Sequence, residues 1–77
     1  MSTHNRFMIR RKNGSTDDAV FAELKAKCSG AEVHLLPSEN LFVLDFNHAL
    51  ELKSFRDLLE NCQTVDTNTA SPADLLI

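Results

Sequence analysis

The chain has 77 residues, of which 43% are hydrophobic and 25% charged, with two glycines and two prolines, and this composition is typical of one folded globular domain. Its net charge of −3 excludes an overall basic field that would attract nucleic acid or an anionic membrane, and its apolar runs are far shorter than a membrane span. A chain of this size buries only about 60–65% of its unfolded surface, so a core together with a deep catalytic cleft is difficult to build.

The chain opens with a predicted strand and helix. Residues 6–11 alternate between core-facing and outward-facing character, which indicates a strand. Ser15 or Thr16 is expected to cap a helix over residues 17–28, and Gly30 to end that helix in a left-handed conformation. The buried stripe of this helix comprises Val20, Phe21, Leu24 and Cys28.

From residue 31 onward the pattern predicts a hairpin, a second helix and a last strand. These elements are a strand at 31–36, a turn at 37–40, a strand at 41–46, a helix at 48–62 and a short strand at 63–67. Asn47 is the expected N-cap of the second helix. The buried stripe of that helix comprises Leu52, Phe55, Leu58, Leu59 and Cys62. Because Asp45 should avoid the core, its neighbours Phe42, Leu44 and Phe46 are expected to point inward.

The resulting β-α-β-β-α-β order favours an α+β fold. Two β-α-β halves with right-handed crossovers interleave most simply as a ferredoxin-like sandwich. That fold has a four-stranded antiparallel sheet of order 4-1-3-2 with both helices on one face. We expect a flexible N-terminus at 1–5, the domain at 6–67 and an extended C-terminal tail at 68–77. The predicted core comprises Leu24, Phe42, Leu44, Phe55 and Leu59.

The sheet face turned away from the helices, here called the outer face, has no cover in this prediction. It carries Arg6, Met8, Arg10, His34, Leu36, Leu41 and Val43. An apolar centre with a charged rim is typical of a protein interface. The alternative is an ordinary surface, because exposed apolar atoms are common on every protein.

Sites for chemistry are sparse in the sequence. The three histidines lack zinc spacing with the cysteines, no glycine-rich phosphate loop is present, and we expect neither catalysis nor a metal nor another cofactor. Cys28 and Cys62 close two antiparallel helices, so we expect unlinked thiols at opposite ends of the domain, as suits a cytoplasmic protein. RNA-recognition domains of this topology stack bases on outer-face aromatics. Here Leu41 and Val43 occupy those positions, which argues against RNA.

Four stretches together resemble the inhibitor I9 family, the propeptides of subtilisin-like serine proteases and their intracellular inhibitor relatives. Residues 5–13 resemble the opening strand of the family, 29–34 its helix stop and second strand, 41–46 its third strand, and 55–66 its second helix leading into a fourth strand. The resemblance covers roughly residues 5–67. It implies that the outer face meets a protease while the C-terminal tail enters the cleft, in the manner of an added strand. The tail residues are Ala73, Asp74, Leu75, Leu76 and Ile77.

The sequence therefore predicts a protein-binding module whose partner is another protein, with no role for nucleic acid or membrane. One form is the inhibitor or chaperone of a subtilisin-type protease. A second is a cytoplasmic peptide-binding chaperone or adaptor, similar to the small chaperones that hold signal peptides, in which the sheet and its edge carry binding. A third is a regulatory domain that forms a homodimer through the outer face.

Overall fold

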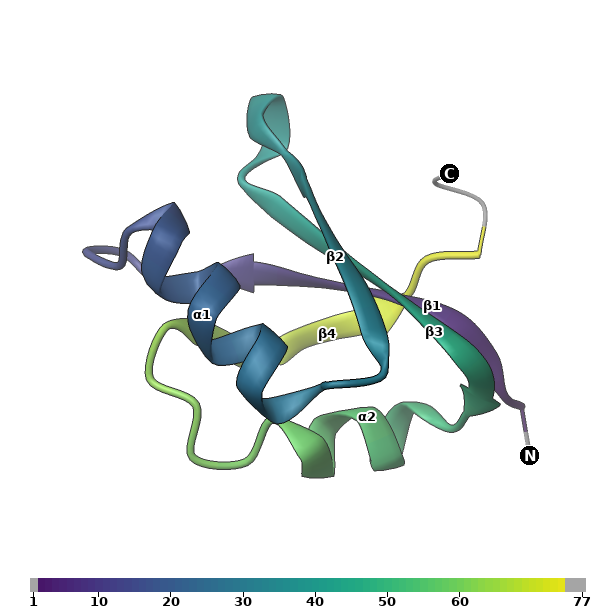
Figure 1. The fold of residues 1–77 in the computed structure, drawn as a ribbon. Coiled ribbons are helices and arrows are strands. Elements are labelled where there is room, and N and C mark those ends of the chain that lie inside the picture. Colours follow the sequence, from purple (N-terminus) through teal and green to yellow (C-terminus); the bar gives the residue numbers. More distant parts are fainter. Residues whose placement is uncertain (1, 75–77) are drawn as a thin grey trace.

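Residues 2–74, the part of the chain that the computed structural model describes, form an antiparallel sheet and two α-helices. The elements are β1 (His4–Arg11), α1 (Asp17–Lys27), β2 (Ala31–Leu36), a 3-10 turn (Pro37–Glu39), β3 (Leu41–Leu50), α2 (Leu52–Leu58) and β4 (Val65–Pro72). The four strands have the order β2-β3-β1-β4, and every neighbouring pair is antiparallel (Figure 1). The predicted α+β class, antiparallel sheet and strand order are confirmed.

The strand register confirms which side chains point into the core. Phe7 pairs with Leu44 and Ile9 with Phe42, so these four side chains lie on one face of the sheet. The five predicted core residues, Leu24, Phe42, Leu44, Phe55 and Leu59, are all fully buried. They belong to one cluster that takes residues from both helices and from this single sheet face. Phe7 and Phe55 stack at its centre with ring centroids 4.5 Å apart.

The first helix begins as predicted and ends differently. The hydroxyl of Thr16 accepts a hydrogen bond from the Ala19 amide at 3.2 Å, which satisfies one of the free amides of the first turn. The helix ends at Lys27, and the expectation of a left-handed Gly30 is wrong, because Gly14 is the glycine with positive φ. The chain instead turns into β2 through a 3.0 Å hydrogen bond from the Ala31 amide to the Cys28 carbonyl.

The boundary between β3 and α2 lies four residues later than predicted. Asn47 is not a helix cap, because β3 continues to Leu50. The strand is extended there by pairing, since β1 starts at His4 and His4 lies opposite Leu50. Glu51 occupies the N-cap position without a side-chain hydrogen bond, and α2 ends at Leu58, four residues before the predicted end at 62.

Both predicted terminal segments are partly built into the sheet. Residues expected to form a tail continue β4 as far as Pro72, and the Ala73 amide donates to the Arg6 carbonyl at 2.9 Å. Where the β1–β4 register shifts, the Arg10 amide donates to the Thr69 hydroxyl at 2.9 Å. At the other end β1 includes His4, inside the segment expected to be flexible, and the His4 ring bonds to the Asp74 carboxylate.

The Glu23 carboxylate joins α1 to the loop that precedes β4. It accepts hydrogen bonds from the Gln63 amide at 3.0 Å, the Thr64 amide at 2.9 Å and the Thr64 hydroxyl at 2.6 Å. Burial alone would raise the pKa of Glu23, but the hydrogen bonds from Thr64, Gln63 and Cys62 outweigh it and hold the pKa below its ordinary value of 4.5. The charged form of Glu23 therefore stabilises the folded state.

Replacement Glu23→Gln is expected to lower the free energy of unfolding by about 1 kcal/mol at pH 7, because a neutral amide with one acceptor oxygen replaces a charged acceptor. The folded-state pKa lies below the unfolded value, so the stabilisation is complete above the unfolded pKa and is lost as pH falls through the folded one. Urea midpoints of both proteins should differ at pH 7 and differ less at pH 3, because the stabilisation is lost as the pH falls through the folded-state pKa. The exposed Glu60, changed to Gln, is the control. An equal difference at both pH values would contradict the role of the charge.

Candidate protein-binding surfaces

The outer face forms as predicted on the side of the sheet opposite the helices. Met8 pairs with Val43 and Arg10 with Leu41 across β1 and β3, while His34 pairs with Val43 and Leu36 with Leu41 across β2 and β3. The same parity places Glu32 and Asp45 on this face. Val43 and Leu41 do not belong to the helix-side core cluster, which agrees with this placement.

The centre of the outer face is much less exposed than the sequence predicts. Val43 is 0% and Leu41 is 4% exposed, whereas both were expected to face solvent. Val43 lies on the inner strand β3, between Met8 and His34 in the two neighbouring strands, so long side chains flank it on both sides. Among residues 2–74 the large hydrophobic side chain that is well exposed is Leu58 on α2, at 41%. The outer face therefore offers no broad apolar patch.

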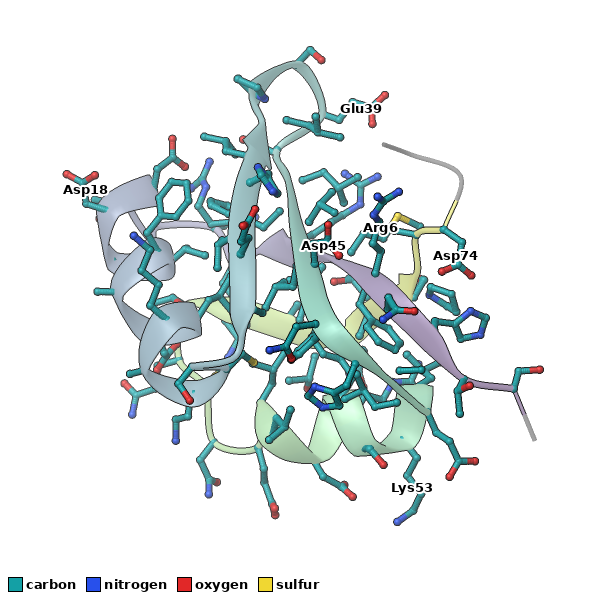
Figure 2. The ribbon with its side chains drawn as sticks, turned by 45° about the vertical axis from the view of Figure 1, so that its right-hand side comes forward. Arg6, Asp18, Glu39, Asp45, Lys53 and Asp74 are labelled. Carbon is teal, nitrogen blue, oxygen red and sulfur yellow. The ribbon has the colours of Figure 1, made fainter. Side chains whose placement is uncertain are left out.

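The charged rim of the outer face is engaged with its own chain. Arg6 Nε lies 3.4 Å from Asp45 Oδ2, and each side chain is about one third exposed (Figure 2). Arg10 Nη1 donates to the Glu39 carbonyl at 2.8 Å. These basic groups stabilise the hairpin turn and the neighbouring strand, and such exposed contacts contribute little each.

Of the predicted tail residues, the structure describes Ala73 and Asp74. Ala73 is buried, at 3% exposure, and hydrogen-bonded to β1, while Asp74 is exposed and bonded to His4. Leu75, Leu76 and Ile77 lie outside the described residues. A cleft-filling role for Ala73 and Asp74 would require both to leave these contacts.

A surface of which the site prediction named only His34 and Leu36 lies along β2. This strand is at the edge of the sheet and pairs with β3, and within the described part of the chain no strand pairs with its other side (Figure 1). Beside it runs an open groove of about 530 Å³, lined by Lys25, Ser29, Ala31, Glu32, Val33 and His34. An edge strand presents unpaired amide and carbonyl groups that can bond another chain. The strand order predicted from sequence already placed residues 31–36 at the edge of the sheet. The sequence therefore contained a signal for this surface.

The outer-face charges near this edge are unevenly balanced. Glu32 on β2 lies directly opposite Asp45 on β3, and like charges in that position destabilise a sheet. Asp45 has Arg6 as a partner on β1. Glu32 has His34 Nε2 at 3.6 Å on its own strand, and its side chain remains 81% exposed. The edge thus carries a solvent-accessible carboxylate whose ion-pair partner is a histidine on the same strand.

The two cysteines are free and buried, but their predicted separation is wrong. Burial, and to a smaller extent the nearby Cys62, raises the pKa of the Cys28 thiol to about 11, so the two thiols interact electrostatically and do not lie at opposite ends. Burial and then Glu23 raise the pKa of Cys62. Both cysteines belong to the one core cluster, Cys28 at the C-cap of α1 and Cys62 four residues beyond the last residue of α2. Thiols with raised pKa values are poor nucleophiles at neutral pH.

Residues 2–74 contain no group of three or more His, Cys, Asp or Glu side chains arranged to hold a metal ion. Within the same residues, neither helix has the length and apolar character needed to cross a membrane. No model of a known protein family matches the chain, and it matches no curated protein and no solved structure.

Proposed function

We propose that this chain is a protein-binding module of ferredoxin-like topology that takes an extended segment of another protein at the free edge of β2. The observation that carries the proposal is the unpaired edge of β2 with an open groove along it. A segment that enters the groove becomes a fifth strand, so its main chain supplies affinity and alternate side chains supply specificity. This corresponds to the peptide-binding chaperone or adaptor among the functions predicted from sequence.

Two features make the edge a better contact surface than the outer face or the tail. The apolar centre of the outer face, Val43 and Leu41, is already buried, so a partner would remove little further apolar area there from water. Ala73 is held against β1, so docking of the tail in a protease cleft would first break sheet contacts. Inhibition of a subtilisin-type protease, implied by the family resemblance, stays a prediction.

The proposal is tested by selecting twelve-residue displayed peptides on the immobilised protein and mapping the best binder by NMR. We expect slowed hydrogen exchange at alternate amides of residues 31–36 and shifted signals from Lys25 and Ser29. Alternate amides are the relevant readout because successive residues of an edge strand direct their N–H groups to opposite sides. Peptides that shift Met8 and Leu36 but leave the exchange of residues 31–36 unchanged would overturn the proposal.

Proline substitution at two adjacent positions gives a matched pair. One of Val33→Pro and His34→Pro removes an amide that bonds β3, and the other removes an amide that faces the groove. We expect one variant to unfold and the other to stay folded while losing the selected peptide. A folded variant that binds the peptide with unchanged affinity would show that the edge is not used.

A further inference from the structure

The charges along the β2 edge indicate which side chains a bound segment should carry. Resting on the proposed function, we propose that the occupant of the β2 edge is a strand that places Lys or Arg opposite Glu32 and apolar side chains at the adjacent positions. Glu32 and Asp45 stand opposite each other, Arg6 pairs with Asp45, and the largely exposed Glu32 has the His34 ring 3.6 Å away on its own strand. A cation on an added strand would lie on the free side of Glu32, where a cross-strand pair of opposite charges is stabilising.

On the helix side of the β2 edge, the added strand should carry an apolar residue. Val33 and Leu35 point toward the helices and pack, partly buried, against the core. A side chain next to the cation on the added strand falls on this side, because successive side chains of a strand alternate between faces. An apolar side chain there extends the contact with Val33.

Lys25 determines which register of such a segment is favoured. Its side chain lines the groove on the helix side of the edge. A shift of the segment by one residue would move every side chain to the other face, so the cation would meet Lys25 and the apolar residue would meet Glu32. Attraction at Glu32 and repulsion at Lys25 therefore select the same register, and specificity requires both an attractive and a repulsive element.

A second copy of β2 is the competing occupant. Antiparallel pairing centred on Val33 would place the histidine of one copy opposite the glutamate of the other. A permanently charged Lys or Arg supplies the missing cation more fully than a histidine that is charged only when protonated. The basic segment is therefore the better match, and self-association is included in the test.

The test compares two seven-residue probes, acetyl-Thr-Val-Lys-Val-Lys-Val-Thr-amide and the same peptide with both Lys replaced by Glu. Their dissociation constants are measured by NMR titration on the unmodified chain, on Glu32→Lys and on Glu39→Lys, which makes the same change of net charge in the hairpin turn. We expect the unmodified chain and Glu39→Lys to bind the lysine peptide about three- to tenfold more tightly. Glu32→Lys should reverse the preference, and 1 M salt should remove it, since the Debye length falls to about 3 Å.

The outcomes separate the inference from the proposed function. Equal binding of both peptides, or a preference that Glu32→Lys leaves unchanged, would overturn the inference while edge binding stands. Failure of both peptides to shift residues 31–36 at millimolar concentration would overturn the inference, and with a fruitless displayed-peptide selection it would overturn the proposed function too. A dimer in sedimentation experiments that Glu32→Lys dissociates would identify a second copy as the occupant and also overturn the inference.

Discussion

Leu59→Ala is expected to lower the free energy of unfolding by about 2–5 kcal/mol, whereas Leu58→Ala should change it by no more than about 0.5 kcal/mol. The two residues are adjacent and chemically identical. Leu59 is fully buried in the core cluster, and Leu58 is 41% exposed. Truncation of Leu59 removes buried methyl groups and leaves a cavity that close-packed neighbours fill only in part.

Denaturant midpoints of the two variants and the unmodified chain check this expectation directly. A domain of this size has a total stability of only about 5 kcal/mol or somewhat more, so Leu59→Ala should be largely unfolded near 37 °C. Leu58→Ala is a control for helix propensity and side-chain volume, since the chemical change is the same. Similar losses in both variants would show that the burial assigned to the end of α2 is wrong.

The elements that the sequence predicted well are those whose local pattern agrees with the tertiary structure. Strands 31–36 and 41–46 alternate in step with the two faces of the sheet, so the inward direction of Phe42 and Leu44 could be derived from Asp45 alone. The same agreement between local pattern and packing predicted the buried side of α1.

The boundaries that were missed depend on partners far away in the chain. Asn47 is a residue type that often caps helices. Pairing between the end of β3 and the start of β1 at His4 nevertheless keeps residues 47–50 extended. Residues 68–72 have no period, yet the Thr69 hydroxyl bonds β1 where the ladder shifts. The position of Cys62 likewise depends on tertiary structure, because α2 ends at Leu58 and leaves Cys62 in the loop before β4.

The candidate site was predicted in part for the same reason. The alternation of side chains along each strand correctly assigned Met8, His34 and Val43 to the outer face. The exposure of a side chain, however, depends on the length of its neighbours as well as on the face it occupies. Val43 is a small residue on an inner strand, and it is buried between longer side chains. The sequence placed Val43 on a candidate contact surface, whereas the structure buries it, so a charged substitution there is expected to impair folding.

Val43→Asp is expected to unfold the domain, with a loss of at least about 3 kcal/mol in the free energy of unfolding. The carboxylate would replace a side chain with 0% exposure, and Asp45 two residues away adds a second negative charge on the same face. Val43→Asn introduces a polar side chain without a charge. At pH 7 it should therefore lower the free energy of unfolding by less than Val43→Asp does. The aspartate variant should regain stability as pH falls below neutrality, because burial raises the pKa of the introduced group and the protonated form is the one compatible with folding.

His34→Asp is the matched control, since it introduces the same charge on the same face at a side chain that is 46% exposed. Its free energy of unfolding should fall by no more than about 1 kcal/mol, a loss set by the low strand propensity of Asp and by the nearby Glu32 carboxylate. Circular dichroism and urea midpoints at pH 7 and pH 5 distinguish the variants. A well-folded Val43→Asp would mean that the centre of the outer face opens to water at little cost, and that result would restore the outer face as a contact surface alongside the β2 edge.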